Sequence, residues 1–176
     1  MDLLQELSRE AAVIGPMVLR LLIAFVAGAI IGAERELHVR SEHGKGAGFR
    51  TYSLVTFGSC LYALASTYGF AATSGGGVDP GRVAAQVVTG IGFLGAGTIL
   101  KDPSGMVRGL TTAAGLWVAA AIGLLIGAGL YFTGLFAAVL VYIILRFHDL
   151  FPNFPLFRRL EEMNREESGD KGADDL

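Results

Sequence analysis

Cysteine, histidine and charge are scarce in this sequence. Among its 176 residues there is one cysteine, Cys60, there are three histidines, and 17% are charged, whereas soluble domains average about 25% charged residues. A single cysteine excludes an internal disulfide and a cysteine-based zinc site. Fourteen basic and 16 acidic residues give a net charge of −2, which excludes a basic nucleic-acid binder. The low charge also excludes an ordinary cytosolic enzyme and a disordered chain.

Long uncharged stretches fill most of the chain, which is 52% hydrophobic with a mean hydropathy of +0.54. A bilayer core of about 30 Å needs roughly 20 apolar helical residues. The run 109–145 has 37 uncharged residues, enough for two helices with a reversal at Gly127-Ala128-Gly129. The sequence therefore predicts an all-α, polytopic membrane protein, a five-helix transmembrane bundle. Its spans are expected at about 13–33, 51–68, 83–100, 109–126 and 128–145.

The loops between these spans differ in charge. Lys and Arg concentrate in cytoplasmic loops, and four basic residues lie between the first two predicted spans, with Lys101 and Arg108 between the third and fourth. Alternation across five spans therefore places the N-terminus outside and the C-terminus inside. The glycine-rich segment 69–81 is expected to be a flexible outer loop.

The two ends of the chain differ from the middle. Residues 1–12 contain Leu3, Leu4 and Leu7 among acidic residues, which predicts a short amphipathic lead-in and not a cleavable signal peptide. Residues 146–176 hold 5 basic and 8 acidic residues and are expected to form an acidic cytoplasmic tail. Within it, a short helix is expected near 156–167 and disorder over 168–176.

Glycines recur in the third predicted span. Gly90-Ile91-Gly92-Phe93-Leu94-Gly95 matches the dinucleotide-binding pattern, but no strand precedes it and no acidic residue follows at the required distance. The same small-residue spacing also occurs in the first and fourth spans, which favours helix packing or partner docking. A kinked third helix that lines a cavity is the alternative. The glycines concerned are Gly28, Gly32, Gly90, Gly92, Gly95, Gly97, Gly123 and Gly127.

A polar cluster is expected at the outer end of the third span. Asp79 followed by Pro80 is typical of a helix start. Asp79, Arg82 and Gln86 also share one helical stripe, which would bind an ion or pair with Arg20. Arg20 itself is either an intramembrane charge or a side chain that reaches outward to the membrane surface.

A second polar cluster is expected at the inner face. Arginines at this boundary are typical membrane anchors, but three groups of polar residues that converge there would also form a network that positions the helices. Lys101 to Gly105 reads as a turn. The residues of this inner cluster are Glu34, Arg35, Arg50, Thr51, Arg108, Thr111 and Thr112.

Catalytic and metal-binding patterns are missing. The sequence has no Ser-His-Asp or Cys-His set and no HExxH motif, and every carboxylate lies at or beyond the end of a predicted span. These absences disfavour an enzyme and a proton relay. Magnesium prefers octahedral oxygen ligands, and Asp79 alone is too little for such a site. No cofactor and no metal site are predicted.

Five motifs follow one another along the chain. They are Glu34-Arg35-Glu36, Gly48-Phe49-Arg50-Thr51, Asp79-Pro80 with Arg82-Val83-Ala84-Ala85-Gln86, Gly90 to Gly97, and Arg108-Gly109-Leu110-Thr111-Thr112-Ala113-Ala114. In their order and spacing they resemble the MgtC/SapB family of bacterial inner-membrane proteins. The resemblance runs from about residue 20 to 145, with Phe49 standing where leucine is expected.

The resemblance implies a five-helix module of the bacterial inner membrane. It also implies a role in stress or virulence, linked to low magnesium and acid, without transport of magnesium itself. It further implies a membrane complex as partner, because at least one member is reported to restrain the F-type ATP synthase. Longer members add a cytoplasmic C-terminal domain, and the short tail here predicts the short form of the family.

Two functions follow from the sequence. The first is a non-enzymatic membrane regulator that binds another membrane complex through the glycine-lined helix faces. The alternative is a homo-oligomeric transporter or channel for a small ion or solute, with the outer polar cluster at its mouth. Membrane lipid and a second copy of the chain are expected partners in either case.

Overall fold

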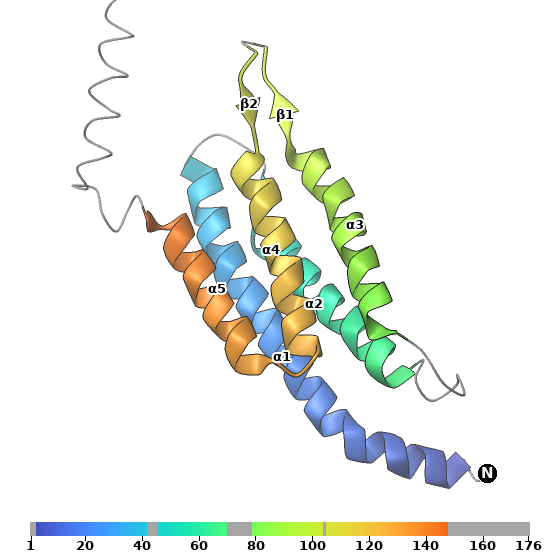
Figure 1. Ribbon diagram of the computed structural model, residues 1–176. Helices are drawn as coiled ribbons and strands as arrows, with labels where there is room; N and C mark the ends of the chain where they lie inside the picture. Colours follow the sequence, from blue (N-terminus) through green and yellow to red (C-terminus); the bar gives the residue numbers. More distant parts are fainter. Residues whose placement is uncertain (1–2, 42–45, 70–78, 104, 148–176) are drawn as a thin grey trace, which may run out of the picture. The chain divides into compact units, whose positions relative to one another are not determined.

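The computed structural model describes residues 3–41, 46–69, 79–103 and 105–147, which are mostly helical (Figure 1). Most of the predicted tail, most of the outer loop and the side chains of the lead-in lie outside what is described. The α-helices are α1 (Leu3–Ser41), α2 (Phe49–Leu64), α3 (Pro80–Thr98), α4 (Leu110–Gly127) and α5 (Tyr131–Leu145). A π-helix, η1 (Ala65–Gly69), continues α2, and two short strands, β1 (Leu100–Lys101) and β2 (Val107–Arg108), separate α3 from α4.

The chain divides into two compact units, Met1–Ile143 and Ile144–Leu176. All the contacts described below belong to the first unit. In the second unit, only residues 144–147 are described.

Helix α1 joins the predicted lead-in to the first predicted span without a break. It contains Pro16, whose ring removes one backbone hydrogen bond and pushes against the preceding turn. Figure 1 shows the N-terminal turns of α1 at an angle to the rest of the helix. The lead-in is therefore part of α1 and not a separate element.

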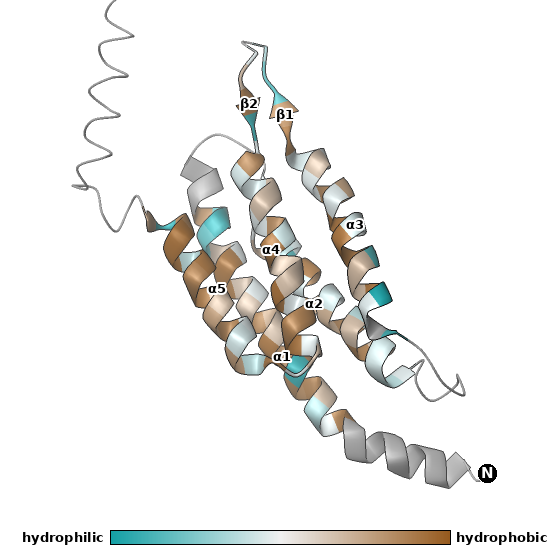
Figure 2. Cartoon of the chain, viewed as in Figure 1, coloured by the Kyte–Doolittle hydropathy of each residue, from teal (hydrophilic) through white to brown (hydrophobic). Residues whose placement is uncertain are grey.

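In the part of the chain that the structure describes, two helical segments are long and apolar enough to cross a membrane, Ile14–Leu37 and Leu110–Gly127. Helix α5 is apolar but shorter. Figure 2 shows hydrophobic residues over most of α4 and α5, and hydrophilic residues in the hairpin and near helix ends. The all-α class is thus confirmed for the described residues, while the five crossings and their orientation stay predictions.

Helix α2 lies between α1 and α4, and α4 also contacts α3. The buried face of α2 is unusually polar: Ser53, Thr56 and Ser59 are buried, while Leu54 is 70% exposed. The Thr56 hydroxyl donates to Tyr52 O at 3.0 Å, which satisfies it within its own helix. A helix surrounded by lipid typically has small hydroxyl residues on its buried face and leucine on its exposed face.

Glycines bring α1 and α4 close to α2 from both sides. A methyl group on Gly28 would lie 2.7 Å from Tyr52 O, and one on Gly32 would lie 2.7 Å from the Phe49 Cα. From the other side, the backbone of Thr56 contacts Gly123, and Gly127 leaves no room for a side chain beside Cys60. Four of the glycines predicted to pack helices therefore do so within the chain.

The predicted turn at Lys101 to Gly105 lies at the end of a short antiparallel hairpin, in which Leu100 pairs with Arg108 and Lys101 with Val107. Asp102 accepts a hydrogen bond from Met106 N at 3.0 Å and pairs with Arg108 Nε at 3.1 Å. Gly109 then begins α4 with φ +88°, where any side chain would collide with Thr98 O. The hairpin therefore fixes how α3 is joined to α4.

Candidate functional site

A groove of about 800 Å³ runs between α2 and α3, and we call it the α2–α3 groove. Aliphatic side chains and glycines dominate its lining, with an arginine from each helix. Its lining consists of Arg50, Thr51, Leu54, Val55, Gly58, Ser59 and Tyr62 of α2 and Arg82, Val83, Gln86, Val87, Gly90, Ile91 and Leu94 of α3.

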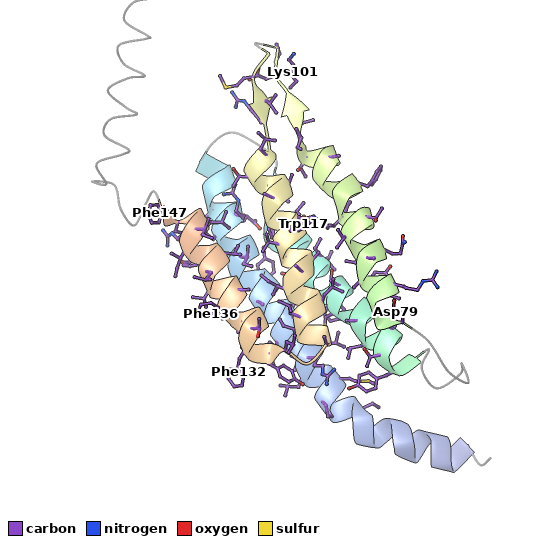
Figure 3. The ribbon with its side chains drawn as sticks, in the orientation of Figure 1. Asp79, Lys101, Trp117, Phe132, Phe136 and Phe147 are labelled. Carbon is purple, nitrogen blue, oxygen red and sulfur yellow. The ribbon has the colours of Figure 1, made fainter. Side chains whose placement is uncertain are left out.

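The predicted outer stripe divides between two roles. Asp79 Oδ1 accepts a hydrogen bond from Gly81 N at 2.8 Å, and Pro80 occupies the first helical position, so Asp79 caps α3 as the helix-start reading predicts. Arg82 and Gln86 instead line the α2–α3 groove. Figure 3 shows Asp79 near one end of α3 and Lys101 beyond the other end.

The partners of Arg20 differ from those predicted from the sequence. Its Nε donates to Tyr131 Oη at 3.0 Å and its Nη1 donates to Gly127 O at 2.8 Å. Its guanidinium also lies 5.5 Å from the ring centre of Tyr68 and 5.8 Å from that of Tyr131, within cation–π range. The suggested pairing with Asp79, Arg82 or Gln86 is not what these contacts show. Arg20 links α1 to the turn between α4 and α5, because its guanidinium binds the Gly127 carbonyl and the Tyr131 side chain there.

Two members of the predicted inner cluster are deeply buried. Glu34 and Arg35 are each 7% exposed, and Tyr52, which is fully buried, donates to Thr112 O at 3.3 Å. Within the described residues, Glu34 Oε2 and Arg35 Nε have no hydrogen-bond partner. A buried polar group normally has one, so these two side chains are the unsatisfied buried charges of the inner end among the described residues.

The other members of the inner cluster point elsewhere. Arg108 is 68% exposed at its side chain and pairs with Asp102 of the hairpin. Thr111 is exposed, in contrast to the buried Thr112. Arg50 and Thr51 line the α2–α3 groove. The predicted convergence of three groups on one network is therefore wrong for these four residues, because Arg108 pairs within the hairpin, Thr111 lies on the exposed side of α4, and Arg50 and Thr51 face the α2–α3 groove.

The glycines of α3 do not pack helices in the way that those of α1 and α4 do. No atom lies within 4 Å of where a methyl group on Gly90, Gly92 or Gly97 would sit, and at Gly95 the nearest atom, Ala113 Cβ, is at an ordinary 3.6 Å. Helix α3 is nevertheless one unbroken α-helix from Pro80 to Thr98, so no break in it supports the alternative of a kinked third helix. Among the residues that the structure describes, nothing lies opposite Gly90, Gly92 and Gly97.

Two tyrosines were missed in the sequence analysis. Tyr52 fills the space between α1, α2 and α4, where its hydroxyl lies against Gly115, and Tyr131 receives Arg20. The buried polar positions of α2 recur at helical spacing, which is a signal that points to Tyr52. Nothing in the sequence pattern points to Tyr131, because its partner is more than 100 residues away.

The chain is similar to proteins of known families. The MgtC family profile matches residues 21–154. The chain is 47% identical over 137 residues to "Putative magnesium transporter YhiD" of Escherichia coli K12, which covers 76% of this chain and 61% of the relative. It is 45% identical over 133 residues to "Protein MgtC" of Salmonella typhimurium LT2, which covers 75% and 52%. No solved structure matches the chain.

An uncharacterized protein of Haemophilus influenzae is 38% identical over 135 residues, which covers 74% of this chain and 55% of the relative. The chain thus spans about half to three-fifths of the length of these curated relatives.

Proposed function

This chain belongs to the MgtC family, and on that basis we propose that it is a multi-pass bacterial inner-membrane regulator. It acts in adaptation to low magnesium or acid by binding another membrane complex, such as the F-type ATP synthase, and it catalyses no reaction. A magnesium-related role agrees with the printed name of the YhiD relative. Because the match covers only 61% and 52% of the YhiD and MgtC relatives, the activity of the whole protein is also part of this proposal.

The distribution of apolar side chains supports a membrane location. Helix α2 buries Ser53, Thr56 and Ser59 while its leucine at position 54 is exposed. On α5, Phe132 is 89% exposed, and Figure 3 shows Phe132 and Phe136 directed away from the other helices. A water-soluble protein rarely exposes so much contiguous apolar surface, whereas lipid is a suitable solvent for it.

The observation that carries the regulator proposal is the open glycine surface of α3. Each glycine inside a helix costs about 1 kcal/mol relative to alanine, and no contact within the described chain compensates at Gly92 or Gly97. Phe93, between them in sequence, is 82% exposed. Partner helices that approach closely over either of these glycines, which lie on different sides of α3, would supply the missing compensation.

The test replaces the open glycines and measures partner binding. In the Gly92→Leu/Gly97→Leu double variant, co-purification with the F-type ATP synthase from native membranes should be lost while the protein still inserts. Gly95 stays unchanged because it faces Ala113 of α4. Gly15→Leu is the matched control, since that glycine also has no atom within 4 Å of an added methyl group but lies on α1. Intact binding in the double variant would contradict the proposal.

A transporter is the second candidate function, because Arg82, Gln86 and Gly90 do line one groove. A second copy of the chain would have to close the open side of this groove. The two arginines in its lining repel a divalent cation, which makes the groove unsuited to magnesium. Reconstituted flux of magnesium or protons in proteoliposomes, altered by Asp79→Asn or Arg82→Gln, would favour transport over regulation.

A further inference from the structure

We propose that Arg50 holds the headgroup of an anionic diacyl phospholipid whose two acyl chains lie in grooves on either side of α2. This is a binding site additional to the partner surface on α3; it rests on the membrane location in the proposed function but not on the binding of another membrane complex. The grooves, the ridge between them and the charge at their shared end carry the proposal.

The second groove, which we call the α1–α2 groove, has a volume of about 410 Å³. Phe25 of α1 lines it together with residues of α2. The Phe25 and Phe49 rings pack edge to face, with their ring centres 6.3 Å apart. Its remaining lining residues are Arg50, Ser53, Leu54 and Phe57.

Arg50 and Leu54 belong to both linings. They lie four residues apart on α2 and so share one face of the helix. Phe49, Ser53 and Phe57 line only the α1–α2 groove, while Val55 and Gly58 line only the α2–α3 groove. The two grooves therefore flank a ridge made by Arg50 and the exposed Leu54, with Arg50 at its start.

The length of the α2–α3 groove suits an acyl chain. Its lining on α2 extends from Arg50 to Tyr62, which is about 18 Å along a helix. One leaflet contributes about 15 Å of hydrocarbon to a bilayer. Gly58 and Gly90 line this groove with no atom within 4 Å of an added methyl group, so nothing in the described chain fills the space beside them.

Charge complementarity selects the headgroup. Arg50 is exposed and has no ion pair with any acidic residue in the part of the chain that the structure describes. Glu36, the acidic side chain that reaches the start of α2, accepts a hydrogen bond from Phe49 N at 3.1 Å. A guanidinium binds phosphate oxygens through two parallel hydrogen bonds, and arginines near a membrane surface attract anionic lipid. Arg82 adjoins the α2–α3 groove alone, so only Arg50 is placed to hold a lipid with two chains.

The experiment measures lipid binding by the full chain in native mass spectrometry, with phosphatidylglycerol, phosphatidylethanolamine and single-chain lysophosphatidylglycerol as the probes. Phosphatidylglycerol should bind most tightly. Arg50→Gln should weaken it about fivefold, the effect expected for one basic residue at a membrane surface, and Arg50→Lys should retain most of the affinity. Lys101→Gln is the matched control, because it removes one exposed positive charge from the hairpin.

Groove filling tests the acyl chains separately from the headgroup. Gly58→Leu should weaken phosphatidylglycerol binding severalfold without lowering the melting temperature, since that position is open. Lysophosphatidylglycerol should bind several times more weakly than the two-chain lipid.

Several results would overturn the proposal. Equal losses in Arg50→Gln and Lys101→Gln would show unspecific attraction, and a loss confined to Arg82→Gln would place the headgroup at the wrong end. Unchanged binding in Gly58→Leu would exclude the α2–α3 groove. Dissociation of an oligomer by that variant, with lipid binding intact, would show that a second copy of the chain occupies the groove.

Discussion

The two sides of α2 use glycine for opposite purposes. Toward α1 and α4, glycines lie so close to α2 that the Thr56 backbone contacts Gly123 and a methyl group on Gly28 would lie 2.7 Å from Tyr52 O. Toward α3, Gly58 and Gly90 border open space in the α2–α3 groove. On the first side, the glycines let neighbouring backbones pack closely on α2. On the second side, no neighbouring atom fills the space beside the glycines, and a groove remains.

This difference shows that glycine content alone does not identify a packing interface in a membrane helix. The same spacing of small residues that brings α1 and α4 onto α2 is also found in α3, where Gly90, Gly92 and Gly97 meet no other helix of the described residues and Gly95 meets Ala113 of α4 at an ordinary 3.6 Å. What distinguishes the two is whether a neighbouring backbone lies opposite the glycine. The open side is where a lipid or a partner helix has room to bind.

Gly123→Leu tests the closed side most severely. The backbone of Thr56 and the Ser59 side chain leave no space for a leucine, and overpacking against backbone costs about 3 kcal/mol or more. We expect little folded protein, measured as the monodisperse fraction in detergent and as melting temperature. A stable Gly123→Leu variant would mean that α4 does not pack on α2 as described.

Arg20→Met tests the polar tie at the edge of the closed side. It removes the hydrogen bonds to Tyr131 Oη and Gly127 O, and bonds from a charged donor contribute about 1.5–3 kcal/mol each when well formed. Because Arg20 is only half-buried, we expect a total loss near the lower figure in denaturant titration. Tyr131→Phe should reproduce part of that loss, and an unchanged midpoint in both variants would contradict the tie.

Tyr52→Phe removes one hydroxyl from the centre of the closed side. It deletes the 3.3 Å hydrogen bond to Thr112 O and keeps the ring, so the expected loss of unfolding free energy is about 1 kcal/mol. Denaturant titration measures it, with Tyr62→Phe in the groove lining as the control. An equal loss of unfolding free energy in Tyr52→Phe and Tyr62→Phe would contradict the difference between the closed side of α2 and the α2–α3 groove.

Gly58→Ala should have the smallest effect and the opposite sign. An added methyl group meets nothing within 4 Å, and alanine favours a helix over glycine by up to about 1 kcal/mol. A small rise in melting temperature is expected, whereas Gly28→Ala on the closed side should lower it. Destabilisation by Gly58→Ala would show that the α2–α3 groove is closed in the membrane.

Much of the local structure was predictable from residues near one another in sequence. Asp79-Pro80 predicts the start of α3, and the reversal at Gly127-Ala128-Gly129 matches the end of α4 and the left-handed Gly129 at φ +92°. The turn after Lys101 likewise lies in the observed hairpin. Each depends on backbone preferences that a few adjacent residues set.

The sequence by itself determined the family, the mostly helical class and, to within a few residues, the ends of α2 to α5, because hydropathy and turn chemistry act locally; both ends of α1 lie well outside the predicted first span. Only the tertiary structure decided which glycines meet a neighbouring helix, that Arg20 reaches Tyr131, and that Arg108 turns away to Asp102. The physical reason is that lipid is as apolar as a helix interface. A hydrophobic stretch therefore does not reveal which of its faces meets another helix, and the rotation of each helix is fixed only when all of them pack together.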